Sequence, residues 1–162
     1  EFWQAFCAHK VLVMQVDSII CAGSPHKLSG FMHLDYVGSQ THWMSPGNGG
    51  FALLDRKRAL DCVVRPEKDM CPPHSKPGAA RCIWGQDAYL AACIQRRGGK
   101  IGTKEEQARF GTQNVFLHKS FGAHQIYRQQ PSWKSNGFDR FCPEYRKVHF
   151  DVGDDSGYGV TY

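Results

Sequence analysis

Short apolar runs alternate with helical spacing along the chain, and this alternation predicts an α/β fold. The run Val11-Leu12-Val13-Met14 is aliphatic and rich in β-branched side chains, which is typical of a buried strand. The other predicted strands have three or four residues each: residues 35–38, 51–54, 100–102 and 115–117. Strands that alternate with helices in this way favour a single domain with a mixed β-sheet.

Three segments carry the apolar spacing of amphipathic helices: residues 56–64, 86–97 and 104–110. Asp55 is placed to cap the first helix, and Gly98-Gly99 ends the second. Thr103 is a predicted N-cap of the third helix, and Glu106 at the third helical position completes a capping-box pattern. Residues 1–4 resemble the end of a further amphipathic helix.

Length and charge narrow the class of protein. The chain has 162 residues and a formal net charge of +5, with Lys and Arg in short, scattered clusters. This distribution indicates an anionic ligand only weakly and does not predict a nucleic-acid surface. No apolar run is long enough to predict a membrane-spanning helix.

The organisation predicted from the sequence has a domain over residues 1–130 and an extension over residues 131–162 that lacks clear periodicity. The chain does not begin with Met, so we expect a fragment whose upstream sequence and targeting signals are missing. The localisation, in the Golgi or secretory lumen or in the cytoplasm, therefore stays open, as does the oligomeric state.

The chain has seven cysteines, and some of them could form either a zinc site or a disulfide. Cys21 and Cys93 lie in apolar surroundings and are expected to be buried as small hydrophobic residues. The remaining candidates surround a proline-rich loop and suggest either a zinc site or one disulfide: Cys62, Cys71, His74 and Cys82. A Cys71–Cys82 bridge would suit a secretory lumen.

A carboxylate follows the first predicted strand, in the segment Gln15-Val16-Asp17. Open α/β sheets place their ligand crevice at the carboxyl ends of the strands. An unpaired buried carboxylate is costly, so Asp17 is expected to be solvated, hydrogen-bonded or close to a cation. A turn closed by its own Asp side chain is the alternative interpretation.

Two glycine-containing segments are further candidates. Gly47-Asn48-Gly49-Gly50 leads into a strand, and its backbone N–H groups could approach a phosphate or a sugar, or could simply form a turn. Trp84-Gly85-Gln86-Asp87 opens a helix, where Asp87 is either a cap or, beside an aromatic ring, a carbohydrate contact. His124 follows Gly122 in a predicted loop and is a metal ligand, a base or a surface histidine.

Seven short motifs in order across residues 2–128 resemble the DUF5672 group of glycosyltransferase-like proteins. The motifs are Phe2-Trp3, residues 11–21, Phe31 with residues 35–38, residues 47–53, residues 84–87, residues 108–110 and residues 120–124. More broadly, the pattern is similar to GT-A glycosyltransferases. The resemblance implies a partial GT-A-like, Rossmann-related three-layer domain that forms the catalytic half of such an enzyme.

The resemblance also assigns roles to individual residues. Asp17 matches the last acid of the D-x-D motif and His124 the late histidine of the metal shell, so a divalent cation, Mn²⁺ or Mg²⁺, is implied. Gly49 and Gly50 match the glycine pair near donor and acceptor, with Asn48 and Gln15 beside the donor. Asp87 matches the acceptor-side catalytic acid, preceded by the sugar-facing Trp84 and Gly85. Gln15 stands where the motif's first acid is expected, and Gln86 where many relatives carry a second acid.

The predicted function is transfer of a sugar from a nucleotide-sugar donor to a carbohydrate or glycoconjugate acceptor. A hard cation held by carboxylate oxygen would neutralise the leaving diphosphate, and a carboxylate base would activate the acceptor hydroxyl. One alternative is a catalytically silent carbohydrate- or nucleotide-binding domain. The other is a zinc-stabilised interaction module. The enzyme hypothesis requires Asp17, Asp87 and His124 to line one cleft.

Overall fold

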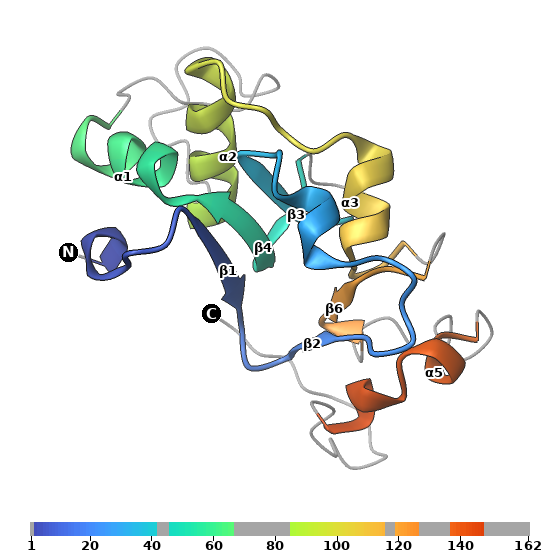
Figure 1. The fold of residues 1–162 in the computed structure, drawn as a ribbon. Helices are drawn as coiled ribbons and strands as arrows, with labels where there is room; N and C mark the ends of the chain where they lie inside the picture. The colour runs from blue at the N-terminus through green and yellow to red at the C-terminus, as the bar shows by residue number, and fades with distance from the viewer. Residues whose placement is uncertain (1, 42–45, 67–84, 116–118, 127–136, 148–162) are drawn as a thin grey trace, which may run out of the picture.

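The computed structural model describes residues 2–41, 46–66, 85–115, 119–126 and 137–147 of the 162-residue chain. These residues form a mixed α/β fold with two small sheets (Figure 1). The strands are β1 (Lys10–Met14), β2 (Ser18–Ile20), β3 (Tyr36–Ser39), β4 (Asn48–Asp55), β5 (Gly111–Thr112) and β6 (Gly122–His124). The helices are α1 (Arg56–Val64), α2 (Gln86–Arg96), α3 (Lys104–Phe110) and α5 (Phe138–Phe141), with 3-10 helices η1 (Phe2–Ala5), η2 (Leu28–Phe31) and η4 (Pro143–Lys147).

The first sheet has the strand order β1-β4-β3, and both neighbouring pairs are antiparallel. Leu53 in β4 pairs with Leu12 on one side and with Val37 on the other. The second sheet has the order β2-β6-β5, in which β2 is antiparallel and β5 parallel to β6. A parallel bridge between Gln40 and Thr112 joins the end of β3 to β5 and thus links the two sheets.

Helices cover both faces of the first sheet because its central strand alternates apolar side chains between them. Ala52 and Leu54 of β4 face a cluster that includes Ala59 of α1 and Ile94 of α2. Phe51 and Leu53 of the same strand belong to the cluster on the opposite face, whose other members are Phe31, Leu34, Val37, Phe110 and Phe121. The ring of Phe51 stacks on Phe110 of α3, with centroids 4.9 Å apart. Burial on both faces explains why β4 is an almost continuous apolar run.

The main predicted elements are confirmed, including their caps. The Asp55 side chain accepts a hydrogen bond from the backbone N–H of Arg58 over 3.0 Å at the start of α1. Burial alone would raise the pKa of Asp55, but this bond and the nearby Lys10 ammonium hold it below its usual value. Thr103 and Glu106 form the predicted capping box of α3, and the bond from the Thr103 N–H keeps the Glu106 pKa low despite partial burial.

Several predicted elements differ from the structure. Residues 100–102 form no strand, only a parallel bridge between Ile101 and Tyr36. Val115 lies outside any strand, and residues 116 and 117 lie outside the described residues. Strands β2, β5 and β6 have two or three residues each, too few to give a periodic signal. Strand β4 begins at Asn48, three positions before the predicted start, and residues 2–5 form 3-10 helix instead of α-helix.

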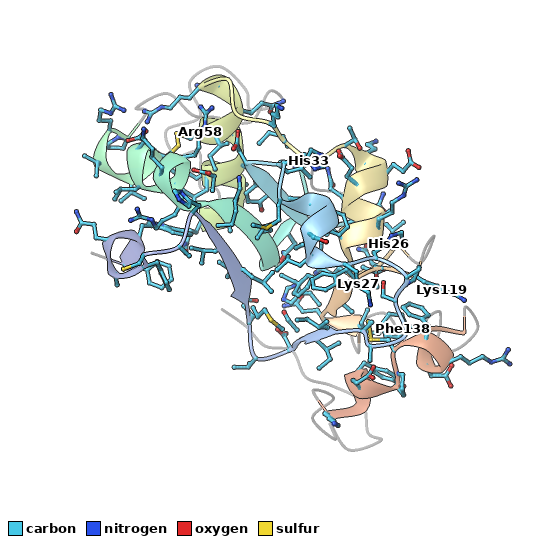
Figure 2. All side chains as sticks on the ribbon, viewed as in Figure 1. His26, Lys27, His33, Arg58, Lys119 and Phe138 are labelled. Atoms are coloured by element: carbon cyan, nitrogen blue, oxygen red, sulfur yellow. A yellow bond between two sulfur atoms is a disulfide. The ribbon has the colours of Figure 1, made fainter. Side chains whose placement is uncertain are left out.

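Residues 137–147 pack against the second sheet. Phe138 contacts the rings of Phe141 and Tyr145 and lies in a cluster with Ala123 of β6 (Figure 2). A disulfide between Cys142 and Cys21 joins this segment to the residue that follows β2. The described part of the predicted extension therefore shares a core with the second sheet, while the predicted boundary at residue 130 stays a prediction.

The cysteine predictions need correction. Cys21 and Cys93 are buried, but each forms a disulfide: Cys21 with Cys142, and Cys93 with Cys62. Because Cys62 is used in this bond between α1 and α2, the predicted four-residue zinc site that includes it is wrong. Cys71, His74 and Cys82 lie outside the described residues, so the predicted Cys71–Cys82 bridge does as well. None of the described helices is long and apolar enough to span a membrane.

Candidate functional site

Strand directions bring the predicted site residues to one edge of the sheets. β1 and β3 are each antiparallel to β4 and hence parallel to one another, and the Gln40–Thr112 bridge and the β5–β6 pairing extend this direction to the second sheet. The carboxyl ends of these four strands thus lie at the same edge as the beginning of β4. Ligand sites of open α/β sheets lie at such edges.

A trio of polar side chains forms where β1 ends beside β6. The Nε2 atom of His124 is 2.9 Å from Oε1 of Gln15 and 3.3 Å from Oδ1 of Asp17. The backbone fixes both neighbours, because the Gln15 N–H donates to the Gly50 carbonyl (2.7 Å) and the Gln125 N–H donates to the Asp17 carbonyl (3.2 Å). The side chain of His124 is 1% exposed and that of Asp17 is 12% exposed. An imidazole, a carboxylate and an amide oxygen therefore converge at one buried point.

The position of His124 differs from the predicted loop. His124 is the last residue of β6 and pairs with Ser18 of β2, which directly follows Asp17. The antiparallel pairing of β2 with β6 thereby brings Asp17 next to His124. The interpretation of His124 as a surface histidine is excluded by its burial.

Gly50 allows the trio to approach β4. A Cβ atom at position 50 would overlap the His124 imidazole and would lie 2.6 Å from Oε1 of Gln15. The Gly50 carbonyl accepts hydrogen bonds from both the Gln15 N–H and the Ser18 hydroxyl, the latter over 2.8 Å. Gly50 is thus required for close approach of the backbone.

Asp87 joins the glycine segment to the N-terminus of α2. Its Oδ2 accepts the backbone N–H of Gly49 over 3.0 Å, and its Oδ1 accepts the N–H of Ala88 over 2.8 Å. A Cβ atom at Gly49 would overlap the Asp87 side chain, and one at Gly85 would lie 2.6 Å from Oδ1. The carboxylate therefore stabilises the first turn of α2 and is held within contact of the glycine pair.

The remaining residues of the glycine segment fix its shape. Gly47 has φ of +102°, a conformation that favours glycine, and its carbonyl accepts the hydroxyl of Tyr36 over 3.1 Å. Asn48 accepts the N–H of Gly50 with its side-chain oxygen over 2.7 Å. Burial, and then the charge of Asp87, raise the pKa of the Tyr36 hydroxyl far above its usual value, so Tyr36 stays a neutral donor.

The oxygen atoms of Gln15 and Asp17 are of the kind that a hard divalent cation prefers, whereas the imidazole nitrogen of His124 is a softer donor. Neighbouring ligand atoms on an octahedral ion with bonds of about 2.1 Å are roughly 3 Å apart, close to the separations of His124 Nε2 from Gln15 and Asp17. The donor set is nevertheless sparse. Among the described residues, no group of three or more His, Cys, Asp or Glu side chains is placed to hold a metal ion. Gln15 supplies a neutral oxygen as the third donor.

The structure thus connects most of the predicted site residues through direct contacts. One continuous series of contacts contains Gln15, Asp17, Asn48, Gly49, Gly50, Gly85, Asp87 and His124. Trp84 lies outside the described residues. The cleft that these residues are expected to line stays a prediction.

Two glutamines beside the trio have no counterpart in the sequence-based prediction. Gln125 has φ of +53°, a left-handed conformation uncommon for this residue type, directly after His124. Its side-chain oxygen accepts a hydrogen bond from Nε2 of Gln113 over 3.0 Å. The only available signal is that each glutamine follows a short strand, and strands of this length are not recognisable from sequence.

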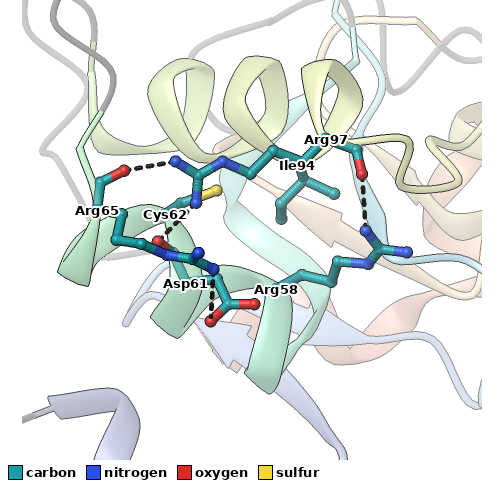
Figure 3. Close-up of a pocket in the computed structure, with 6 residues that line it drawn as sticks. All are labelled: Arg58, Asp61, Cys62, Arg65, Ile94 and Arg97. Atoms are coloured by element: carbon teal, nitrogen blue, oxygen red, sulfur yellow. Dashed lines mark hydrogen bonds and ion pairs between the residues drawn. The ribbon is translucent and has the colours of Figure 1, made fainter.

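A cavity of about 410 Å³ lies away from this edge, near the C-terminal ends of α1 and α2 (Figure 3). Arg97 donates to the Asp61 and Arg65 carbonyls, and Arg58 donates to the Arg97 carbonyl over 2.9 Å. Ion pairs join Arg58 to Asp35 and Arg65 to Asp61. The guanidinium groups of Arg58 and Arg97 thus bond backbone carbonyls, and those of Arg58 and Arg65 pair with carboxylates, which is the pattern of a structural junction between the helices.

Comparison with known proteins gives a family but no function. A family model described as "Protein of unknown function (DUF5672)" matches residues 1–124. This range contains every residue of the site. No curated protein and no solved structure matches the chain.

Proposed function

The chain belongs to the DUF5672 family, and we propose that it is a glycosyltransferase-like protein that transfers a sugar from a nucleotide-sugar donor to a hydroxyl acceptor. The observation that carries this proposal is the contact of His124 with both Gln15 and Asp17, beside the glycine pair and Asp87. A partial GT-A-like fold is part of the proposal, supported by the position of these residues at the carboxyl ends of parallel strands.

The donor diphosphate is proposed to bind beside Asp17 and His124. A bound Mn²⁺ or Mg²⁺ would supply charge neutralisation of the leaving diphosphate. Asp17 contributes the negative charge of the site, and Gln15 orients the imidazole when its Oε1 accepts a hydrogen bond from a protonated Nε2 of His124. The Gly47–Gly50 segment allows the donor close access to the backbone.

Asp87 is the proposed base for the acceptor hydroxyl. Its carboxylate is held in place by the N–H groups of Gly49 and Ala88, and each oxygen keeps a lone pair that can accept a proton. When the acceptor oxygen attacks the anomeric carbon, the bond from that carbon to the diphosphate breaks and the hydroxyl proton moves to Asp87.

A catalytically silent carbohydrate- or nucleotide-binding domain is the second candidate. Gln15 favours it, because an amide replaces the first carboxylate of the D-x-D motif and weakens the attraction for a cation. The engagement of both Asp87 oxygens by backbone N–H groups is also consistent with a cap alone. In this alternative the same edge binds the ligand without turnover.

An oxidising compartment is the proposed location of the activity. Cys21–Cys142 and Cys62–Cys93 both connect buried segments, and disulfides of this kind are typical of secreted and lumenal proteins. The proposal therefore favours the secretory lumen over the cytoplasm.

Hydrolysis of nucleotide sugars by the purified protein tests the proposed enzyme. A panel of UDP- and GDP-sugars is incubated with Mn²⁺ or with chelator, and release of nucleoside diphosphate is measured. We expect release from at least one donor that requires Mn²⁺ and is lost in Asp17→Ala. The matched control is Asp61→Ala on α1, a partly exposed aspartate remote from the site, which should retain the activity. Donor binding without any release, in a protein that melts cooperatively, would favour the silent binding domain.

A further inference from the structure

A set of uncharged polar residues lies buried at the same edge of the sheets, beyond the residues assigned so far. Its members follow or end β3 and β5: Ser39, Gln40, Thr41, Thr112, Gln113 and Asn114. Each is at most 8% exposed. Polar side chains are rarely buried in such a group without a structural or ligand-binding reason.

Hydrogen bonds connect this set to the proposed donor site. The Gln40 N–H donates to the Gly111 carbonyl (2.7 Å), and the Gln113 N–H donates to the Gln40 carbonyl (3.3 Å). Nε2 of Gln113 then donates to the side chain of Gln125, whose own N–H donates to the Asp17 carbonyl. The backbones of Gln40 and Gln113 are therefore tied to the segment that contains Asp17, and the side chain of Gln113 contacts it through Gln125.

Two of these amides have unused hydrogen-bonding capacity. The Oε1 atoms of Gln40 and Gln113 are inaccessible to solvent and have no hydrogen-bond partner among the described residues. An unsatisfied buried polar group destabilises the folded protein, because it gives up hydrogen bonds to water without gaining others. Exchanging oxygen and nitrogen by turning an amide over would not remove this cost, because an unpaired N–H group would take the place of the oxygen.

The conformation of Gln125 adds strain at the same place. A left-handed backbone at a non-glycine residue is unfavourable and is maintained only where surrounding contacts enforce it. Here the bonds to Asp17 and Gln113 hold it. Local strain and unsatisfied polar groups of this kind are typical of functional sites.

We propose that Gln40 and Gln113 bind hydroxyl groups of the donor sugar, a specificity that rests on the proposed transferase function. An amide offers both an acceptor and a donor, which matches a sugar hydroxyl in either role. No member of the set carries an ionisable side chain, so the set suits the neutral sugar ring and not the diphosphate. The diphosphate remains at Asp17 and His124. Binding requires the two amides to turn toward the ligand, since their oxygens are covered.

The test compares nucleotide sugars with the corresponding nucleoside diphosphates. UDP, GDP and a panel of UDP- and GDP-sugars are titrated calorimetrically in Mn²⁺ against wild type, Gln40→Met and Gln113→Met. Methionine has nearly the shape of glutamine but makes only weak hydrogen bonds through its sulfur. The matched control is Gln95→Met, at an exposed position of α2.

We expect each site variant to bind nucleoside diphosphate within about twofold of wild type and to lose about tenfold in affinity for the preferred nucleotide sugar, as expected for one lost hydrogen bond. The melting temperature of Gln40→Met should stay equal to or rise above that of wild type, because the substitution removes an unsatisfied amide. Gln95→Met should bind both ligands as wild type does.

The proposed specificity would be overturned if the variants lost equal affinity for nucleotide sugars and for nucleoside diphosphates, or if neither variant lost affinity. Either result would leave the transferase proposal intact. A lower melting temperature with unchanged discrimination would assign the amides a structural role and would also overturn it. If wild type binds no member of either panel, the proposed function fails, and the specificity fails with it. Gln40→Asn, which keeps the amide on a shorter side chain, serves as the second variant if a methionine variant does not fold.

Discussion

The backbone N–H of Gly49 donates to Oδ2 of Asp87 over 3.0 Å, although 38 positions separate the two residues in the chain. This bond makes the glycine segment and the first turn of α2 one structural unit. Since Gly50 touches His124 directly, the same unit continues into the trio of Gln15, Asp17 and His124. Changes in the glycine segment should therefore disturb both proposed halves of the site.

Gly50→Ala is expected to displace the His124 imidazole, because the added methyl group would overlap it. Overpacking of this kind typically costs about 1–3 kcal/mol of stability. We expect a lower melting temperature and at least about a tenfold loss of Mn²⁺-dependent nucleotide-sugar affinity, measured by calorimetry.

Gly30→Ala is the control for this change. A Cβ atom at Gly30 has no atom within 4 Å, and Gly30 lies in the short helix η2 away from the site. It should melt and bind as wild type does. Wild-type affinity in Gly50→Ala would show that the trio is not part of the donor site.

Asp87→Asn should separate catalysis from donor binding. The asparagine can still accept one backbone N–H, so the start of α2 should persist, but it cannot take the acceptor proton. We expect nearly unchanged donor affinity and a transfer rate lower by about a hundred- to ten-thousand-fold. If the variant melts lower by about the 1 kcal/mol of a lost cap and turns over normally, Asp87 is a cap only.

The charge of Asp55 should make part of the folding stability depend on pH in the acid range. Its pKa is lowered in the folded protein, so its charge stabilises the fold at pH values above the usual aspartate pKa. That contribution disappears as the pH falls through the lowered folded-state pKa. Asp55→Asn retains a capping side chain without the charge, so it should be less stable than wild type at pH 7 and equal to it in strong acid. Asp55→Ala removes the cap as well as the charge, so it should lose about 1 kcal/mol in strong acid and more at pH 7. Parallel pH profiles of wild type and Asp55→Asn would refute the role of the charge.

The two disulfides should contribute unequally to stability. Cys21–Cys142 closes a loop with a sequence separation of 121, and Cys62–Cys93 one of 31. Chain entropy gives about 5 and about 4 kcal/mol respectively. Denaturant unfolding of the double variants Cys21→Ser with Cys142→Ser, and Cys62→Ser with Cys93→Ser, should show a larger loss for the first pair. Unchanged unfolding midpoints in both would indicate that the bonds do not form.

The sequence predicts elements whose signals are local. The caps Asp55 and Thr103 and the long apolar runs identify β1, β4, α1 and α3, because capping and side-chain alternation depend on neighbouring residues. The resemblance selects the site residues, and the structure brings those it describes into contact. The partners of Cys21 and Cys93 could not be predicted, since pairing depends on which elements pack together. The short strands β5 and β6 were not predicted because two or three residues give no periodic signal, and Gln113, which follows β5, was therefore not predicted as a site residue.

The central claim is that Asp17 and His124 form the diphosphate end of a nucleotide-sugar site. Calorimetric titration of the preferred nucleotide sugar into wild type and Asp17→Asn, each with Mn²⁺ and with chelator, tests it most directly. We predict binding to wild type that is at least about tenfold tighter with Mn²⁺, and loss of this metal dependence in Asp17→Asn. Absence of nucleotide-sugar binding to wild type, or equal binding to both proteins under both conditions, would contradict the claim.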